Sequence, residues 1–206
     1  MPAARKSKQA VVSEFRCEEI LEAASKVFGR RGFGGATVDE IAEAAGVAKG
    51  TVYLYFPSKR EIYLEVLRRG LALLTEETVR HVAAAPTPAD KIRAFVETRV
   101  RGAEEHRDLI RIYHSEFGHI DPAHVNQEFK NLYLEQVKTL EGVLEEAAAQ
   151  GLIRPLRTKA AAFTLHYMVH GLVMQRVFGW SRESVAADIE FLFQMIWRGL
   201  AGCIES

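Results

Sequence analysis

The strongest constraint on this chain is the segment Thr37–Arg60, which predicts two short helices joined by a tight turn. Thr37 followed three residues later by Glu40 forms a capping-box pattern at a helix start. Gly46 stands where the end of that helix favours a residue that tolerates left-handed geometry. The first helix has one apolar face at helical spacing, formed by Val38, Ile41, Ala42 and Ala45.

The second short helix has only two clear core anchors, Val52 and Phe56, four residues apart. Its other positions are basic, small or aromatic and need not be buried. They are Lys49, Gly50, Thr51, Tyr53, Leu54 and Tyr55. A short helix that exposes such residues needs a partner for its surface, and a helix-turn-helix places this second helix in the DNA major groove. The pattern therefore predicts a DNA-binding helix-turn-helix.

The stretch from Ile20 to Leu67, and above all Gly46–Lys59, resembles the DNA-binding domain of the tetracycline-repressor (TetR) family of bacterial transcription regulators. The resemblance implies an all-α, nine-helix fold. Residues 1–60 would form the helix-turn-helix domain with a basic N-terminal arm, and residues 61–206 a helical ligand-binding and dimerisation domain. Beyond the first third of the chain, only length, helicity and a few loop signals match.

The resemblance also implies which residues contact double-stranded operator DNA. Five residues fall where the family contacts phosphates, namely Thr37, Thr51, Tyr53, Tyr55 and Lys59. Four fall where it approaches base edges, namely Ala48, Lys49, Gly50 and Leu54. The alternative for Tyr53 and Tyr55 is that they only pack the small domain.

The distribution of charge along the sequence supports this assignment, whereas the net charge of the whole chain does not indicate a nucleic-acid partner. The formal net charge is zero, but residues 1–60 hold ten Lys/Arg against seven Asp/Glu. The excess gathers at Arg5-Lys6-Ser7-Lys8 and around the second short helix, and positive charge of this kind favours phosphate binding. The arm either contacts DNA or is a solvated terminus.

Helix signals continue along the chain and strand signals are nearly absent. Outside the helix-turn-helix, we expect helices over about 13–31, 58–84, 88–105, 107–117, 121–150, 158–178 and 182–203. Pro86-Thr87-Pro88 is the clearest linker, because Thr87 can cap the following helix and Pro88 suits its first position.

The last two helices have apolar faces wider than one neighbouring helix can cover, which favours a four-helix bundle between two subunits. We expect Phe193 and Trp197 at or beside this interface. A two-fold axis also fits palindromic DNA, whose half-sites lie about 34–36 Å or a multiple apart. The alternative is that both helices form the core of a monomer.

Several polar residues interrupt apolar helical faces: Arg99, Tyr113, His114, Tyr133, His166 and His170. Because burial without partners costs roughly 1–3 kcal/mol each, they must be exposed, paired or lining a cavity. As a group they predict a mainly apolar pocket with a few polar anchors. The candidate ligand-binding residues are Phe95, Arg99, Tyr113, Phe117, Tyr133, His170 and Met174.

The sequence is similar to family members that govern fatty-acid metabolism, which implies an acyl-CoA or fatty-acid effector. Drug-like compounds and other metabolites are the alternatives. Arg99, Arg101, Arg107 and Arg111 are candidates for an anionic head group, Arg99 foremost. A ligand would act through its different affinities for the DNA-bound and free states.

Other classes of function have weaker support. His166 and His170 have the spacing of a zinc-binding H-E-x-x-H motif, but Tyr167 replaces the glutamate and no third ligand is obvious. No phosphate loop, nucleophile elbow or Cys/His pair is present. We therefore predict no enzyme, cofactor or metal site. A metal-sensing regulator and an architectural DNA-binding protein stay open as alternatives.

The two cysteines, Cys17 and Cys203, suggest free thiols in a reducing cytoplasm. The N-terminus lacks the apolar stretch of a signal peptide. No uncharged apolar run is long enough to span a membrane, so we expect a cytoplasmic protein.

Overall fold

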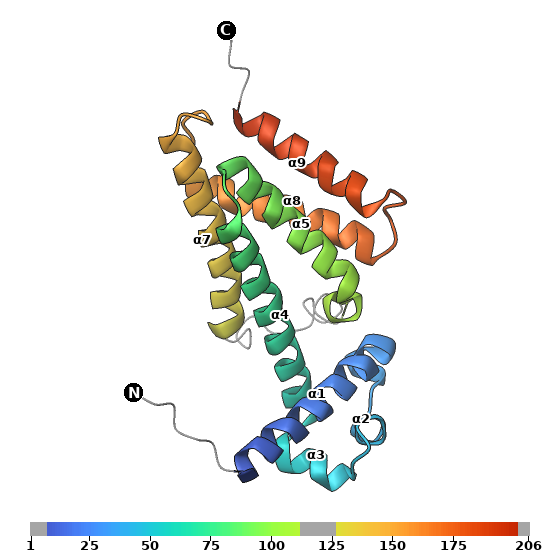
Figure 1. Cartoon of the computed structure of the whole chain (residues 1–206). Coiled ribbons are helices and arrows are strands. Elements are labelled where there is room, and N and C mark those ends of the chain that lie inside the picture. The colour runs from blue at the N-terminus through green and yellow to red at the C-terminus, as the bar shows by residue number, and fades with distance from the viewer. Residues whose placement is uncertain (1–7, 112–126, 202–206) are drawn as a thin grey trace, which may run out of the picture. The chain divides into compact units, whose positions relative to one another are not determined.

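A computed structural model describes residues 8–111 and 127–201, in which helices are joined by turns and loops and no strand occurs (Figure 1). The helices are α1 (Lys8–Gly35), α2 (Val38–Ala44), α3 (Lys49–Tyr55), α4 (Lys59–Ala84), α5 (Pro88–Glu105), α7 (Gln127–Ala149), α8 (Thr158–Val177) and α9 (Val185–Ala201). Residues 107–111 are helical as well. Each of the nine predicted segments has a helical counterpart here, and the predicted all-α fold is confirmed. No helix in the described ranges is long and apolar enough to cross a membrane.

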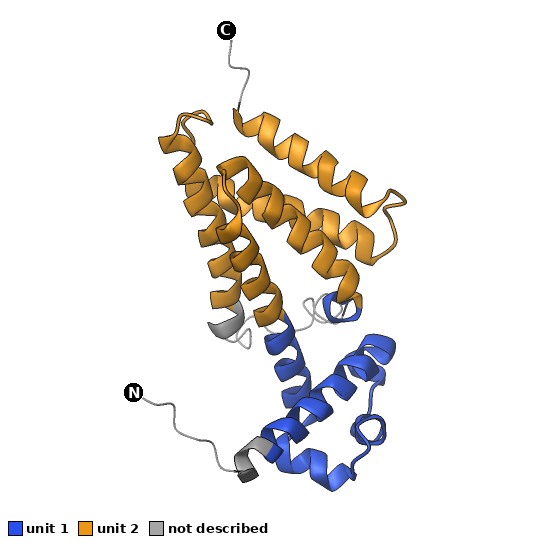
Figure 2. Ribbon diagram, viewed as in Figure 1, with its two compact units in different colours: residues 1–70, 108–120 blue, residues 71–107, 121–206 orange. Residues whose placement is uncertain are grey.

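The chain divides into two compact units (Figure 2). Unit 1 extends to Gly70 and includes residues 108–111, and unit 2 comprises Leu71–Arg107 and the described residues from 127 onward. Unit 1 includes the first turns of α4, because they pack on α1. Tyr63 places its ring edge against Phe28, with centroids 5.2 Å apart.

In unit 1, α1 begins at Lys8 rather than near residue 13, so Lys8 belongs to a helix, while residues 1–7 lie outside the described ranges. The regular helix is interrupted at Gly32, whose φ of 67° is readily adopted only by glycine. The chain then folds back, so that Phe33 packs on Phe28 and Tyr63. This ring cluster joins α1 to α4.

The helix-turn-helix forms as its sequence predicts. Thr37 and Glu40 make both hydrogen bonds of the capping box. Gly46 follows the end of α2 and has a φ of 65°. Val52 and Phe56 are buried, which confirms them as the anchors of α3.

Unit 2 packs α5 against α7, α8 and α9. The Thr87 side chain caps α5, and Pro88 occupies its first turn, as predicted. The last helix begins at Val185, a little later than expected, because the Ser184 hydroxyl accepts a hydrogen bond from the Ala187 N–H at 3.1 Å and caps it. The start predicted for α7 lies outside the described residues.

A partly buried ion-pair network joins α5, α8 and α9. The Arg176 guanidinium, 11% exposed, donates to Glu104 at 2.8 Å and to Asp188 at 2.5 Å. Asp188 also accepts from the Ser181 hydroxyl at 2.8 Å. These carboxylates raise the pKa of Arg176 against the opposing effect of its burial. The network fixes the end of α8 to the start of α9.

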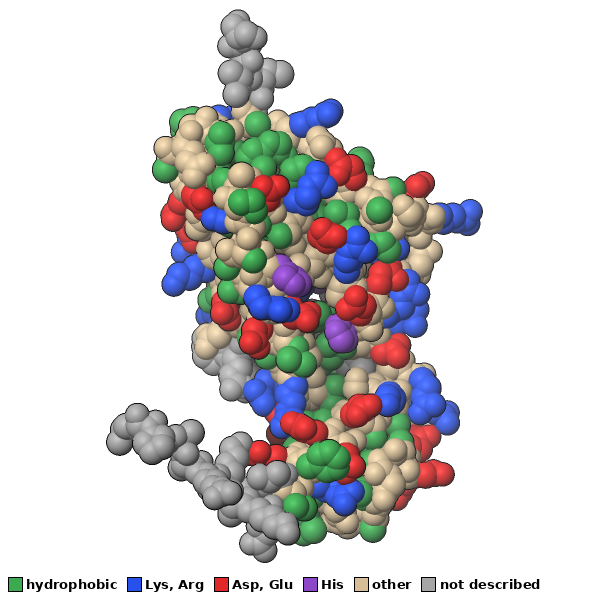
Figure 3. Space-filling view, in the orientation of Figure 1, with side chains coloured by type: hydrophobic (Ala, Val, Ile, Leu, Met, Phe, Trp, Pro, Cys, Tyr) green, Lys and Arg blue, Asp and Glu red, His purple; other side chains and the backbone are tan. Residues whose placement is uncertain are grey.

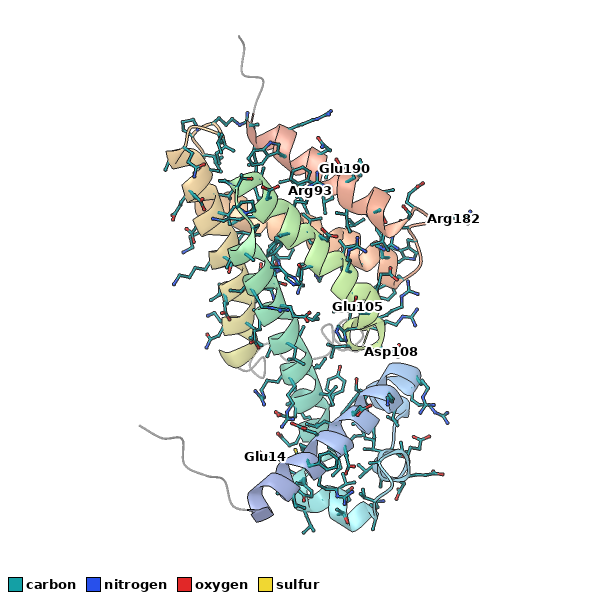
Figure 4. All side chains as sticks on the ribbon, in the orientation of Figure 1. Glu14, Arg93, Glu105, Asp108, Arg182 and Glu190 are labelled. Carbon is teal, nitrogen blue, oxygen red and sulfur yellow. The ribbon has the colours of Figure 1, made fainter. Side chains whose placement is uncertain are left out.

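Phe193 and Trp197, expected at or beside a subunit interface, stack on each other in α9 with ring centroids 6.4 Å apart. Phe193 is only 6% exposed within the single chain. Its ring packs under the Arg93 guanidinium at 3.9 Å, and Arg93 also pairs with Glu190 at 2.6 Å (Figure 4). The exposed large apolar residues of α9 are Phe191 and Met195, one helical turn apart. Phe193 is buried because α5 covers the side of α9 that carries it.

Candidate DNA-binding surface and effector site

The outward surface of α3 carries most of the predicted DNA contacts. Leu54 is 83% exposed and Tyr53 46%, although both are large apolar or aromatic side chains. Ala48, Lys49 and Gly50 are exposed, and Thr51 and Tyr55 are half-buried. A Cβ atom added at Gly50 would have no other atom within 4 Å. Helix α3 thus presents a mixed polar and apolar surface at the part of the helix-turn-helix that reads base edges.

Lys49 is held by a carboxylate of the neighbouring helix. Its ammonium donates to Asp39 of α2 at 2.8 Å, and both side chains are solvent-exposed. This hydrogen bond raises the pKa of Lys49. The pair orients Lys49 at the first turn of α3 while leaving it accessible to solvent and DNA.

Thr37 and Glu40, at the start of α2, connect this helix to α1. The Thr37 backbone N–H donates to the Glu40 carboxylate at 3.0 Å, and this bond lowers the pKa of Glu40. Arg31 lies 3.2 Å from the same carboxylate. Thr37 is exposed, and its hydroxyl caps the helix, so a phosphate contact by this residue stays a prediction.

Lys59 has a structural role that the sequence did not indicate. Its ammonium donates to the backbone carbonyls of Phe33 at 2.7 Å and Ala36 at 2.8 Å. It also lies over the Phe33 ring, 4.5 Å from the centroid. Lys59 therefore ties the start of α4 to the turn between α1 and α2, whatever it contributes to phosphate binding.

We expect Lys59→Met to lower the free energy of unfolding of unit 1 by about 1.5–3 kcal/mol, since two charge-assisted hydrogen bonds to carbonyls are lost. Denaturant unfolding followed by circular dichroism measures this loss. Lys26→Met is the matched control, because Lys26 makes only an exposed pair with Glu22. If Lys59 contacts only phosphate, Lys59→Met should leave the free energy of unfolding unchanged. It should then make the salt dependence of DNA binding shallower by about 1.

The face shown in Figure 3 has Lys, Arg, Asp and Glu side chains interspersed over both units, with no large area of one sign. The expected role of the basic arm falls on residues 5–8, of which only Lys8 is described.

The second candidate site lies inside unit 2, where a chain of hydrogen bonds crosses three helices. The Thr75 hydroxyl of α4 donates to the Leu71 carbonyl at 2.8 Å. Gln136 of α7 donates its amide N–H to the Thr75 oxygen at 2.7 Å. The Gln136 oxygen lies 3.1 Å from Nε2 of His166 on α8. All three side chains are at most 6% exposed.

The hydrogen bonds from Thr75 through Gln136 determine which ring nitrogen of His166 carries the hydrogen. Because the Gln136 oxygen can only accept, Nε2 of His166 carries the hydrogen and Nδ1 is left as an acceptor. Nδ1 is buried and has no hydrogen-bond partner among the described protein atoms. Burial, followed by the nearby positive charges of Arg99 and His170, lowers the pKa of His166 to about 3. The ring is therefore neutral at physiological pH.

The structure gathers four of the predicted ligand-binding residues around His166. The Tyr133 ring lies edge-on to it at 4.7 Å, and the Phe95 ring lies 6.3 Å away. Arg99 is close enough to lower the pKa of both histidines, and burial is the larger cause for His170 as well.

The remaining ligand-binding candidates are less closely placed. Met174 lies half-buried on α8, one turn after His170. Tyr113 and Phe117 fall outside the described residues. Of the other arginines considered for a head group, Arg101 pairs with Glu97 at 2.8 Å and Arg107 donates to the Arg176 carbonyl at 2.9 Å.

Sequence reasoning missed the centre of this group, which consists of Thr75, Gln136 and His166. Each occupies a position in an apolar helical stripe, and that was the available signal. His166 is among the polar residues that predict the pocket, but it is not among the candidate ligand-binding residues. In the structure Nε2 of His166 faces Gln136, and no cluster of three or more metal-ligating side chains occurs in the described ranges.

Two family models match the sequence. Residues 20–66 match the N-terminal model described as bacterial regulatory proteins of the tetR family, and residues 85–174 match a tetracyclin repressor-like C-terminal domain. The transcriptional repressor KstR2 of Rhodococcus jostii is 30% identical over 146 residues, which cover 68% of each chain.

Two solved structures illustrate the similarity of the fold. The regulator FadR of Bacillus subtilis in complex with stearoyl-CoA has a TM-score of 0.78 at 21% identity, covering 89% of this chain and 98% of that one. AibR in complex with isovaleryl coenzyme A and operator DNA has a TM-score of 0.71 at 22% identity, covering 88% of this chain and 98% of that one. At these identities the likeness concerns the fold.

Proposed function

This chain belongs to the TetR family of bacterial regulatory proteins, and we propose that it is a homodimeric repressor released from a palindromic operator by a small, mainly apolar effector. The family consists of regulators rather than enzymes. The observation that carries the proposal is α3, which buries Val52 and leaves Lys49, Tyr53 and Leu54 exposed. A surface of this kind is suited to base edges and thymine methyl groups in the major groove.

The effector we propose is an acyl-CoA or a fatty acid. Support comes from unit 2, where aromatic rings surround His166 and Arg99 provides a positive charge nearby. The structures of FadR and AibR, which share this fold, were each determined with an acyl-CoA. Arg99 would hold the anionic part of the ligand, while the ring cluster would contact its apolar part.

Release would follow from a difference in affinity between two states of the protein. An effector that prefers the arrangement of the two heads that does not fit DNA lowers operator affinity without touching the DNA surface. Coupling of this kind is typically worth about 1–3 kcal/mol, or roughly 5–150-fold in affinity.

Lys49→Ala is expected to weaken binding to an operator by roughly tenfold and to relax base preference at one position, because one base-edge contact is lost. Fluorescence anisotropy with the operator and its single-position variants measures both effects. Lys26→Ala is the matched control, since it removes the same charge from another exposed salt bridge of unit 1. Equal operator binding by both variants and by the wild type would contradict the assignment of α3.

A further inference from the structure

We propose that the effector carries a neutral hydrogen-bond donor, a hydroxyl group on an otherwise apolar chain, and that Nδ1 of His166 accepts its hydrogen bond. This inference rests on the proposed function, because it describes the ligand that unit 2 would bind. It adds a chemical requirement that an apolar pocket alone does not impose.

The requirement follows from the directions of the hydrogen bonds. The Thr75 hydroxyl uses its only hydrogen on the Leu71 carbonyl, so the Thr75 oxygen must accept from Gln136. The Gln136 amide therefore turns its oxygen toward His166. This fixes the hydrogen on Nε2, and Nδ1 remains a pure acceptor at the end of the chain.

A buried acceptor without a partner is a costly group, since its interaction with water is lost on folding. His166 is 6% exposed and its Nδ1 is fully buried. A ligand hydroxyl that reaches Nδ1 would restore the missing bond. The site would then distinguish ligands by a hydroxyl on their apolar part as well as by an anionic head.

The surroundings of His166 disfavour two kinds of ligand group at this position, acceptors without a hydrogen and cationic donors. A carboxylate or thioester carbonyl has no hydrogen to donate, so its lone pairs would face the lone pair of Nδ1. An ammonium group would lie near Arg99, whose charge already disfavours a positive His166. The edge of the Tyr133 ring at 4.7 Å and the ring of Phe95 favour a hydroxyl on an apolar chain.

The test compares dodecanoyl-CoA with its 3-hydroxy and 12-hydroxy derivatives by isothermal titration calorimetry and by release of operator DNA. We expect at least one hydroxylated thioester to bind the wild type about tenfold more tightly than dodecanoyl-CoA. His166→Phe should lose this preference and still bind dodecanoyl-CoA. His81→Gln is the control, because His81 is an exposed histidine of the same unit and contacts Thr98.

Circular dichroism and operator binding show whether His166→Phe is folded. If it folds poorly, a measurement on the wild type still tests the inference. In the wild type, ¹⁵N NMR of labelled histidine should show Nε2 protonated and the Nδ1 resonance of His166 shifting only with a hydroxylated ligand. An Nδ1–H form of His166, or equal affinity of all three thioesters, overturns the inference and leaves the proposed function standing.

Failure of every thioester to bind would contradict the proposed effector class instead. The hydroxyl requirement is then tested by comparing the binding affinities of 1-dodecanol and methyl dodecanoate, because only the alcohol has a hydrogen-bond donor. Tighter binding of the alcohol, lost in His166→Phe, supports the inference. Equal binding or no binding of this pair overturns it.

Discussion

Phe191→Glu together with Met195→Glu is expected to yield monomers whose operator affinity falls by roughly 10²–10⁴-fold, as happens when two linked contacts become one. Phe191 is 65% exposed and Met195 45%, so neither contributes much to the core of the single chain. Charged residues at these positions would be desolvated in a subunit interface but not in a monomer. Dissociation should therefore occur without unfolding.

Analytical ultracentrifugation at micromolar concentration measures the mass, and anisotropy with operator DNA measures the affinity. Leu73→Glu is the matched control, because Leu73 is 61% exposed and lies in unit 2 on α4, away from the proposed interface. The control should stay dimeric and bind DNA. A wild type that sediments as a monomer, or a double variant that stays dimeric, would contradict an interface built by these residues of α9.

Arg176→Met is expected to lower the free energy of unfolding by about 3–5 kcal/mol. The reason is that Asp188, which is 10% exposed at its side chain, loses its positive partner and stays largely buried. Glu104 loses its 2.8 Å bond to the same guanidinium. The loss should be larger than for any single exposed pair, because buried charges lack water to replace the missing partner.

Thermal or denaturant unfolding of the full chain measures this loss. Arg101→Met is the control, since Arg101 makes an exposed pair with Glu97 on α5 and should cost less than about 1 kcal/mol. Adding Asp188→Leu to Arg176→Met should recover part of the loss by removing the uncompensated charge. If Arg176→Met is no more destabilising than Arg101→Met, the network does not hold α8 to α9.

The helix-turn-helix could be predicted from sequence because the interactions that define it are local. The capping bonds join Thr37 and Glu40, three residues apart, and Gly46 supplies its positive φ by itself. The anchors Val52 and Phe56 share one face of a single short helix. Patterns of this kind depend on helix geometry alone, so caps, turns and anchors agree with the structure.

Effects between distant segments required the tertiary structure. Lys59 meets the carbonyls of Phe33 and Ala36 because α1 is interrupted at Gly32, and no local pattern indicates that contact. Phe193 is buried because α5 covers that side of α9 with Arg93. An apolar face read from sequence shows that a surface will be covered, but not by which partner.

The candidate effector site shows the same limit most clearly. Helical spacing marked His166 as polar within an apolar stripe, and the sequence could say no more than that it is exposed, paired or lining a cavity. Its partner Gln136 is 30 residues away, and Gln136 in turn bonds Thr75, 61 residues away. The sequence by itself determined the helices and the DNA-reading segment. Only the packing of α4, α7 and α8 decided which buried donors and acceptors meet, and so which atom of His166 has no hydrogen-bond partner among the described protein atoms.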